Sequence, residues 1–519
     1  MIKAVILSGR VCNGRTQVVV DYERITQDNV VKALQTALPS FERNIAEINY
    51  LWEYYKGKQE ILHREKIVRP EINNKVVVNI AQEIVAFKIG YQLAEPLQYT
   101  ARMQSSSDNA ELYEQKLEQV TQLNTLMFAE DKAAHDRDLF EWLCIAGIGF
   151  RMIQADTDDV ATNYEQLDDS PFEIYTLDPR KACVVRSSLY HNKPLMAIYK
   201  TKDVENDKPI YNVYTEDVLY TIRDNDVINS RAHTYGSIPI IEYRLNNARM
   251  GVFEPVLAVL DAINNIESNR LDDVEQTIQA LLKIVNCDID DEKIERIRRL
   301  AAVKIKSIDP ALKADIDIIK NNLDQSGVQA LKDDLYKSVI KICGMPNSGD
   351  AASSSDTGAA VLLRDGWTLA EAHAKSYELQ FKTAEREFLR VVLNICKQSI
   401  KTDFSLNPKD IEFSFNRRNY ENILVKSQVL TTMLSNDKIH PQLAFQSCGL
   451  FTDPDAAYKQ SCEYVEDNKE DEQDDTQADT DNLILPATQA ATPEPDKGGT
   501  TVINSVRDIK STHALNEKE

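Results

Sequence analysis

Hydrophobic side chains recur every three or four positions from residue 26 to residue 144, which predicts a series of amphipathic helices. The first helix is expected to begin at Thr26 and to end at Pro39, because a proline removes a backbone hydrogen bond. Ser40 then caps a second helix, which ends at Gly57. Later helices are predicted from Asn73 to Gly90 and, as a pair, from Asp108 to Cys144.

The hydrophobic period changes to two after Ile148, and this alternation predicts short strands. Clusters of Asp, Asn, Gly and Pro separate the strands, as in antiparallel meanders. Helices followed by a run of strands indicate an α+β fold rather than a doubly wound one. The predicted strands are 150–153, 172–177, 183–185, 195–199, 210–214, 218–222 and 238–243.

A long helix is predicted from Pro255 to about Lys283, and helical spacing returns from Leu323 to Cys343. Between them lies an insert, 284–322, that reads as strand, helix (291–301), strand (303–308) and strand (316–319). The helix from Pro255 to about Lys283 is either part of an ordinary hydrophobic core or one arm of a helical hairpin. Such a hairpin would project from the rest of the fold and pack beside copies of itself. Acidic residues occupy the other faces of this helix: Asp261, Glu267, Asp272, Asp273 and Glu275.

The segment from Gly344 to Gly358 is rich in serine, glycine and alanine and lies between two long helical patterns. Such residues bury little apolar area, so ordering them gains little against backbone entropy. A soft loop between long helices usually contacts something that moves or binds. A helix from 359 to 401, a strand from 411 to 415 and helical segments up to Tyr464 follow.

The composition limits the classes of function. The chain has 519 residues and a net charge of −22, which argues against tight binding of phosphates. Residues 465–519 are acidic and of low complexity, and we expect them to be disordered. The eight cysteines show no CxxC spacing, which favours a reducing cytoplasmic compartment. The sequence contains no run of about 18 apolar residues, so it predicts no membrane-spanning helix, and no secretory signal is recognisable at the start.

The sequence contains no recognisable catalytic motif. It lacks the phosphate loop GxxxxGK[ST], GxSxG, HExxH and GxGxxG. Ser338 and Lys341 match SxxK, but Val339 and Ile340 between them read as helix core. The acidic turns at 156–159 and 479–482 lack the glycine and glutamate of a calcium loop, and the seven histidines lack ligand spacing. We therefore expect no metal, no cofactor and no catalytic residue.

A group of basic residues makes the insert locally basic, between residues 296 and 306, within an acidic protein. A solvated face and a docking surface explain this group about equally well, whereas reading of a DNA duplex is least favoured because no aromatic residues are interleaved. The group comprises Arg296, Arg298, Arg299, Lys304 and Lys306.

Several short motifs, in this order, resemble the siphophage-type portal proteins of tailed bacteriophages. The resemblance covers most of residues 26–466. Thr357 stands where the family usually has serine, and the first 25 residues and those after Glu466 match nothing in it. The motifs are Tyr54–Gly57, Asn73–Lys75, Gly90–Tyr91, Leu177–Pro179, Ile238–Tyr243, Asn246–Asn247, Phe253–Val256, Thr357–Ala360, Asn416 and Leu450–Pro454.

The resemblance implies a portal-like α+β fold, rich in helices, with an antiparallel β wing, long stem helices and a small α/β clip. The parts it implies are an N-terminal extension (1–25), a wing (26–251), stem helices (252–283 and 323–343), a clip (284–322), a tunnel loop (344–357), a long wing helix and strand (358–415), a crown (416–464) and an acidic tail (465–519).

The resemblance also implies a function, that of a non-enzymatic ring of about twelve subunits at one capsid vertex of the virion, assembled in the host cytoplasm. Double-stranded DNA would pass through it, without sequence-specific binding, during packaging, retention and ejection. The implied partners are the terminase, later a head–tail connector, and the major capsid and scaffold proteins, with no membrane. The alternatives are an internal head or scaffold component, and an enzyme without recognisable motifs.

Two sets of site residues follow from the resemblance. The basic residues of the insert would dock the motor and the connector. The tunnel-loop residues that would face DNA are Asn347, Ser348, Gly349, Asp350, Ser353, Ser354, Ser355 and Asp356.

Overall fold

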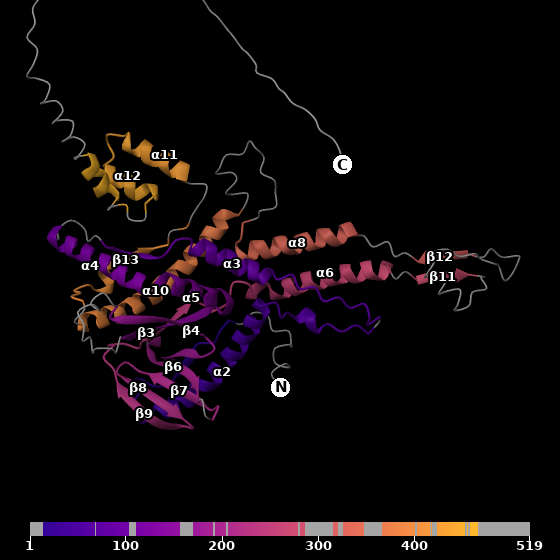
Figure 1. The fold of residues 1–519 in the computed structure, drawn as a ribbon, viewed down its shortest axis with the longest axis horizontal. Helices are drawn as coiled ribbons and strands as arrows, with labels where there is room; N and C mark the ends of the chain where they lie inside the picture. The colour runs from indigo at the N-terminus through magenta and orange to yellow at the C-terminus, as the bar shows by residue number, and fades with distance from the viewer. Residues whose placement is uncertain are drawn as a thin grey trace, which may run out of the picture. The chain divides into compact units, whose positions relative to one another are not determined.

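The computed structural model describes residues 14–67, 69–102, 110–155, 170–189, 192–203, 206–278, 281–285, 315–319, 325–346, 366–399, 402–415, 417, 423–451, 454 and 457–465. Contacts divide the chain into one unit of Met1–Asp453 and a second of Pro454–Glu519. The described part of the second unit is residue 454 and a helical stretch, 457–465. All elements named below belong to the first unit, which is drawn in Figure 1.

The first helix, α2, runs without a break from Val30 to Tyr55, so the prediction of two helices that meet at Pro39 is wrong. Pro39 lies on the exposed side of α2, where water can hydrogen-bond to the carbonyl that loses its partner. Ala37 and Phe41 are buried on either side of the proline, so core packing holds the helix together there.

Helix α3 (Ile80–Gln92) begins seven residues later than Asn73, the predicted start. The pair predicted between 108 and 144 is confirmed as α4 (Ala110–Ala129) and α5 (Lys132–Ala146). Gly147 ends α5 with φ +77°, and a Cβ at this position would lie 2.3 Å from the Arg249 carbonyl oxygen. This close approach requires glycine.

The strands form a six-stranded sheet in the order β1-β5-β6-β7-β8-β9 and a three-stranded sheet in the order β10-β3-β4. Every pairing is antiparallel except that of β1 with β5. The seven predicted strands are confirmed, whereas β1 and β9 were missed. The strands are β1 (Val18–Val20), β3 (Ile148–Ala155), β4 (Phe172–Leu177), β5 (Ala182–Ser187), β6 (Pro194–Lys202), β7 (Pro209–Tyr214), β8 (Val218–Arg223), β9 (Asp226–Ala232) and β10 (Ile240–Arg244).

Helices α6 (Leu257–Ile278) and α8 (Gln325–Cys343) lie side by side, and Figure 1 shows β11 and β12 beyond their far ends. Strand β11 (Leu281–Val285) pairs with β12 (Asp315–Ile319) in antiparallel register. The prediction that α6 continues to Lys283 is therefore wrong, because Leu281 already pairs with Ile319. The predicted strand at 316–319 is confirmed, whereas the helix 291–301 and the strand 303–308 lie outside the described residues.

The longest of the described helices, α10 (Trp367–Gln398), packs against the three-stranded sheet, and Trp367 in its first turn contacts Phe87 and Tyr91 of α3. After it, β13 (Ile411–Ser414) pairs with β2 (Gln98–Ala101), a strand that the sequence did not predict. Helices α11 (Ile423–Leu434) and α12 (Pro441–Cys448) follow. Helices combined with mainly antiparallel sheets confirm the α+β class.

The largest hydrophobic cluster joins α3, α5, β3, β4, α6, α8 and α10. Its apolar contacts therefore connect the sheet region to the base of the α6–α8 pair. Five described cysteines are buried and free, as expected for small hydrophobic residues: Cys144, Cys183, Cys343, Cys396 and Cys448.

Among the described residues, we find no helix that combines the length and the hydropathy needed to span a bilayer.

Candidate functional site

The two sets of predicted site residues lie outside the described residues. These are the eight between Asn347 and Asp356, and Arg296, Arg298, Arg299, Lys304 and Lys306. The described part of the candidate site therefore consists of the elements next to them. These are the α6–α8 pair, which leads to the insert, and the two ends of the 347–365 segment.

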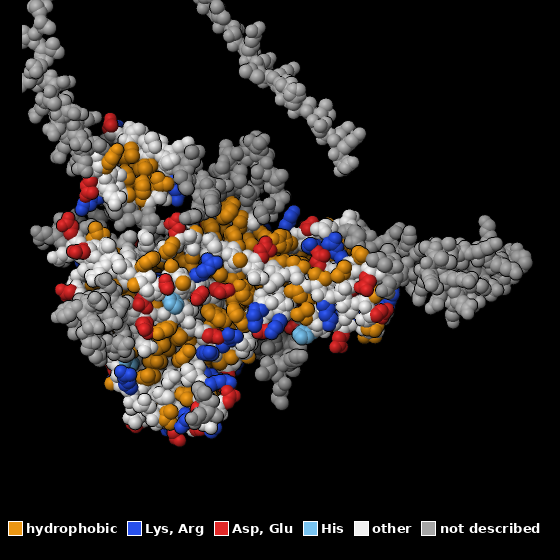
Figure 2. Space-filling model, viewed as in Figure 1, with side chains coloured by type: hydrophobic (Ala, Val, Ile, Leu, Met, Phe, Trp, Pro, Cys, Tyr) orange, Lys and Arg blue, Asp and Glu red, His pale blue; other side chains and the backbone are white. Residues whose placement is uncertain are grey.

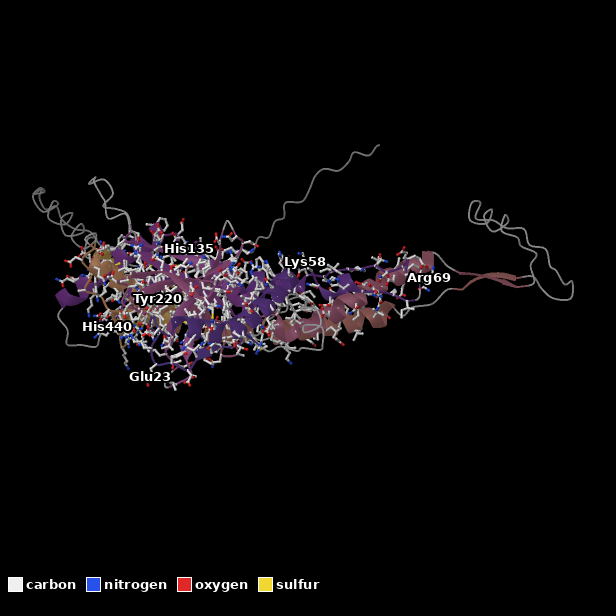
Figure 3. The ribbon with its side chains drawn as sticks, turned by 90° about the horizontal axis from the view of Figure 1, so that it is seen from below. Glu23, Lys58, Arg69, His135, Tyr220 and His440 are labelled. Atoms are coloured by element: carbon white, nitrogen blue, oxygen red, sulfur yellow. The ribbon has the colours of Figure 1, made fainter. Side chains whose placement is uncertain are left out.

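Residues 58–79, which we call the strap, run along α6. The backbone N–H of Val76 donates to Ser268 Oγ over 2.9 Å, and that of Val78 donates to Asn264 Oδ1 over 2.8 Å. Ser268 and Asn264 are both buried. Figure 3 labels Lys58 and Arg69 on the strap, with Arg69 beside the outer part of the helix pair. The polar side chains of α6 thus provide hydrogen-bond partners for residues 76–78 of the strap, which form no helix or strand of their own.

Asp272 is the main anchor of the strap. Its carboxylate accepts hydrogen bonds from the Asn74 backbone (2.7 Å), from Arg64 (3.1 Å) and from Lys66. Burial raises the pKa of Asp272, but hydrogen bonds from Lys66 and Asn74 outweigh this, so the pKa is lowered overall.

The acidic face predicted for α6 is therefore not simply a solvated one. Asp272 is buried and paired, and Asp261 accepts a hydrogen bond of 2.9 Å from the Tyr54 hydroxyl. Figure 2 shows Lys and Arg side chains interspersed with Asp and Glu over the face of the helix pair that it presents. The charge of this face is mixed.

Ionic and polar contacts hold α6, α8 and α3 together. Glu267 on α6 lies 2.6 Å from Lys332 on α8 and 3.3 Å from Arg270. The Tyr336 hydroxyl on α8 donates to Glu83 on α3 over 2.8 Å. These contacts fix α8 against α6 and against α3.

The two ends of the 347–365 segment lie next to each other. Gly344 ends α8 with φ +59°, and Gly366 precedes α10 with φ +80°. A Cβ on Gly366 would lie 3.4 Å from the carbonyl oxygen of Met345. The described residues on either side of this segment thus lie close together.

A buried lysine fixes the first of these ends. Lys88 Nζ on α3 donates to the carbonyl oxygen of Gly344 over 2.9 Å and lies near the rings of Phe87 and Tyr377. Burial lowers the pKa of Lys88 to about 8. A cation at the C-terminal end of a helix also interacts favourably with the helix dipole.

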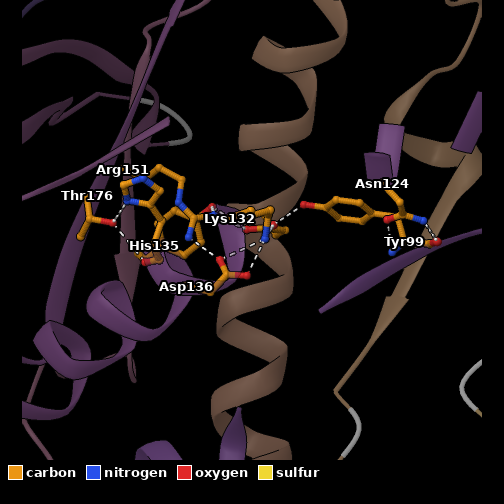
Figure 4. Close-up of polar contacts among 9 residues, drawn as sticks. Tyr99, Asn124, Lys132, His135, Asp136, Arg151 and Thr176 are labelled. Atoms are coloured by element: carbon orange, nitrogen blue, oxygen red, sulfur yellow. Dashed lines mark hydrogen bonds and ion pairs between the residues drawn. The ribbon is translucent and has the colours of Figure 1, made fainter. Parts of the chain in front are cut away.

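Four charged side chains form a buried network that fixes α10 against β3 (Figure 4). Lys132 lies 2.7 Å from Asp136 and 2.9 Å from Glu385, and Arg151 lies 3.4 Å from Glu385. Burial raises the pKa of Glu385, but Lys132 and Arg151 outweigh this and hold it well below its usual range. The Tyr243 hydroxyl donates to Glu385 over 2.6 Å. With at most 4% of each charged side chain exposed, the network has no access for a substrate.

Sequence reasoning missed this network. Lys132 and Asp136 are four residues apart on α5, a spacing that also describes an ordinary exposed helix pair. Arg151 lies within an apolar strand, and this was the one available signal, because an arginine between buried neighbours requires a partner.

The described residues offer no sign of metal or nucleophilic chemistry. No cluster of three or more His, Cys, Asp or Glu side chains among them could hold a metal ion. Ser338 donates to the Asp334 carbonyl oxygen within α8, and Val339 and Ile340 are buried. The SxxK match is thus part of a packed helix, as predicted.

Comparison with known proteins gives one family. The model of the family described as "Phage portal protein, SPP1 Gp6-like" matches residues 35–477. Among solved structures, a chain from the neck of an empty gene transfer agent particle is 12% identical, with a TM-score of 0.43, 72% of this chain covered and 90% of that one. A chain from the virion of a native gene transfer agent particle is 11% identical, with a TM-score of 0.41 and the same coverage. No curated protein sequence matches significantly. Because the family match spans most of its length, the chain belongs to the SPP1 Gp6-like family of phage portal proteins.

Proposed function

We propose that this chain forms a ring-shaped DNA channel at one vertex of a phage-like capsid, through which the genome is packaged, retained and ejected. The family match over residues 35–477 carries this proposal. Portal proteins are structural components rather than enzymes, and the buried ionic network and packed SxxK helix are in keeping with a structural role. The number of subunits would be about twelve.

The described elements suggest a division of labour within the subunit. The sheets with α2, α3, α4, α5 and α10 would form the wing, and α6 and α8 the stem. The insert 284–322 would form the clip, residues 344–357 the tunnel loop, residues 416–464 the crown and residues 465–519 an acidic tail. In this scheme the strap and Asp272 support the stem, and Lys88 and Gly344 support one end of the tunnel loop.

A channel for moving DNA must not retain it. The chain carries a net charge of −22, and repulsion between acidic walls and phosphates acts over about one Debye length, roughly 8 Å at physiological salt. Loop residues 347–356, with small side chains and two aspartates, would contact the duplex only transiently.

The clip would provide the docking surface outside the capsid. Five of its basic residues, those from Arg296 to Lys306, would face first the terminase and later the connector. The wing would contact the major capsid and scaffold proteins, and the ring would assemble in the host cytoplasm before it becomes part of the virion.

Electron microscopy and light scattering of the purified full chain test the ring. Closed rings with a central hole are expected, and a stable monomer at high concentration overturns the proposal. The copy number per particle separates a portal from the alternative: one ring supports the proposal, whereas hundreds of copies indicate an internal scaffold.

A loop deletion tests the channel. Removal of residues 350–355 should leave ring assembly unchanged and should impair DNA packaging. Loss of assembly would mean that the loop has a structural role and would contradict a DNA-facing one.

A further inference from the structure

A shallow pocket of about 460 Å³ lies between α2 and strand β6, next to the turn that joins β4 to β5. This α2–β6 pocket has Ile45 and Tyr199 in its walls, together with the side chains of five charged residues. The charged residues are Asp178, Arg180, Lys181, Lys200 and Lys202.

The charge of the α2–β6 pocket is opposite to that of the chain as a whole. Four of the charged residues described in its lining are cations and one is a carboxylate, whereas the chain carries a net charge of −22. The guanidinium group of Arg180 donates hydrogen bonds of 2.6 to 3.0 Å to both carboxylate oxygens of Asp178. Lys202 lies 2.8 Å from Asp207. No described carboxylate lies within 4.0 Å of the ammonium groups of Lys181 and Lys200, so these two cations remain available to an incoming anion.

A rigid aromatic support lies beneath Arg180. Its guanidinium carbon lies 5.5 Å from the ring of Trp52 and 5.4 Å from that of Trp142, and the centroids of the two rings are 4.6 Å apart. Both tryptophans are partly exposed, and together they are two of the three in the chain. Tryptophan and arginine are the residue types most enriched where binding energy concentrates in protein interfaces.

A second cavity on the same sheet shows what is special about this pocket. A cleft of about 680 Å³ between the two sheets also contains cations, but its charges pair with one another. Arg186 lies 3.2 Å from Glu242, and Lys193 lies 3.5 Å from Glu216. The charged residues that line this cleft are five carboxylates and four cations, so it has no surplus of positive charge, unlike the α2–β6 pocket.

We propose that the α2–β6 pocket binds an acidic peptide segment of a partner protein. The carboxylates of the peptide would pair with Lys181 and Lys200, and an apolar side chain of the peptide would lie against Ile45 and Tyr199. A DNA backbone fits less well, because duplex binding requires a track of cations along regularly spaced phosphates, and this pocket is concave with partly apolar walls. The proposal does not depend on the ring channel.

Binding of defined probes to the full chain, in its own assembly state, tests the proposal. The probes are a short fluorescent peptide of Glu and Asp with one central Leu, the same peptide with Lys in place of the acids, and a short DNA duplex. The acidic peptide is expected to bind and to change the fluorescence of Trp52 and Trp142, and the basic peptide is not. Failure of the acidic peptide to bind, or tighter binding of the duplex, overturns the proposal.

Charge-reversal variants locate the site. The pair Lys181→Glu and Lys200→Glu should weaken binding of the acidic peptide by about tenfold or more. The matched control is Lys193→Glu with Lys208→Glu, the same charge change at residues that directly precede β6 and β7 of the same sheet, outside the pocket. An equal loss in the control would mean diffuse attraction and would overturn the proposal. If the first pair destabilises the fold, the milder Lys181→Gln with Lys200→Gln must reproduce the loss for the proposal to stand.

Discussion

Arg15 and Glu254 form a buried ion pair, with 2.7 Å between Nη2 and Oε1, that joins the start of the described chain to the base of α6. The same carboxylate accepts hydrogen bonds from the backbone N–H groups of Gly14 (3.2 Å) and Gly251 (3.0 Å). Arg15 also contacts Glu47 on α2 at 3.1 Å. The family match begins only at residue 35, so Arg15 lies outside the matched region and its partner Glu254 lies within it. Within the extension 1–25, residues 14–20 are thus an integral part of the fold.

Replacement of Arg15 by methionine should lower the free energy of unfolding by about 3 to 5 kcal/mol, because it breaks a buried ion pair with Glu254. Denaturant unfolding of the purified variant measures this. Arg24→Met is the control, because the pair of Arg24 with Asp217 is exposed on both sides and should contribute less than about 1 kcal/mol. Equal effects of the two substitutions would contradict a structural role for the buried pair.

Gly14→Ala tests the close approach of the N-terminal segment. Gly14 has φ +63°, and a Cβ at this position would lie 1.8 Å from the carbonyl oxygen of Ala248. The segment must move, so we expect a clear loss in the midpoint of thermal unfolding. Gly90→Ala is the matched control in helix α3, where nothing lies within 4 Å, and it should stabilise by about 0.5 to 1 kcal/mol. A neutral Gly14→Ala would show that the segment is held loosely.

Glu385→Gln tests the buried network. Loss of the carboxylate leaves Lys132 and Arg151 short of negative charge, and we expect a cost of about 3 to 5 kcal/mol at neutral pH. The folded pKa of Glu385 is lowered, so its charge stabilises the fold above the unfolded-state pKa of about 4.3 and this contribution declines as the pH falls below it. The difference between the wild type and the variant should therefore shrink in acid.

Unfolding of both proteins between neutral pH and pH values below about 4 measures this dependence. Glu387→Gln, on the same helix but only partly buried, serves as the control and should show a small difference. A wild-type advantage that stays constant down to the acid limit would refute the assigned cause of the lowered pKa.

Local periodicity predicted the helices and most strands, because these signals lie within the segments themselves. It failed where distant partners decide the structure. Residues 73–79 have apolar residues at helical spacing, yet they stay extended because Asn264, Ser268 and Asp272 accept their backbone and side-chain hydrogen bonds. Strand β9 is too polar and exposed to show alternation, and β1 has only three residues.

Charge patterns in the sequence were also an incomplete guide to the candidate site. Asp272 was predicted on an acidic face, and only the fold shows that Arg64 and Lys66 neutralise it. Glu385 shares its helix with three other glutamates, Glu371, Glu378 and Glu387, and nothing in its neighbours along the chain distinguishes it. The order of short motifs and elements, in contrast, was enough to indicate the family that the match later gave.

Lys88→Met tests the contact that holds the end of α8. The wild type must bury an ammonium group whose pKa is lowered to about 8 by burial, so between pH 8 and about 10.4 the unfolded chain binds more protons than the folded one. The stability of the wild type relative to the variant should therefore rise with pH across this window, by about 3 kcal/mol. The titratable groups that face Lys88 are Cys144 on α5, Cys343 on α8, and His373 and Tyr377 on α10.

Lys75→Met is the matched control, because Lys75 also donates to a backbone carbonyl, that of Leu62 at 2.8 Å, but is exposed. Its difference from the wild type should be small, and equal slopes for the two variants would refute the burial argument. Hydrogen exchange at the last turn of α8 gives a second readout. Lys88→Met leaves the Gly344 carbonyl oxygen without its donor, so exchange there should accelerate, whereas Lys75→Met should leave it unchanged. Unchanged exchange in both variants would mean that Lys88 does not fix this end of the helix.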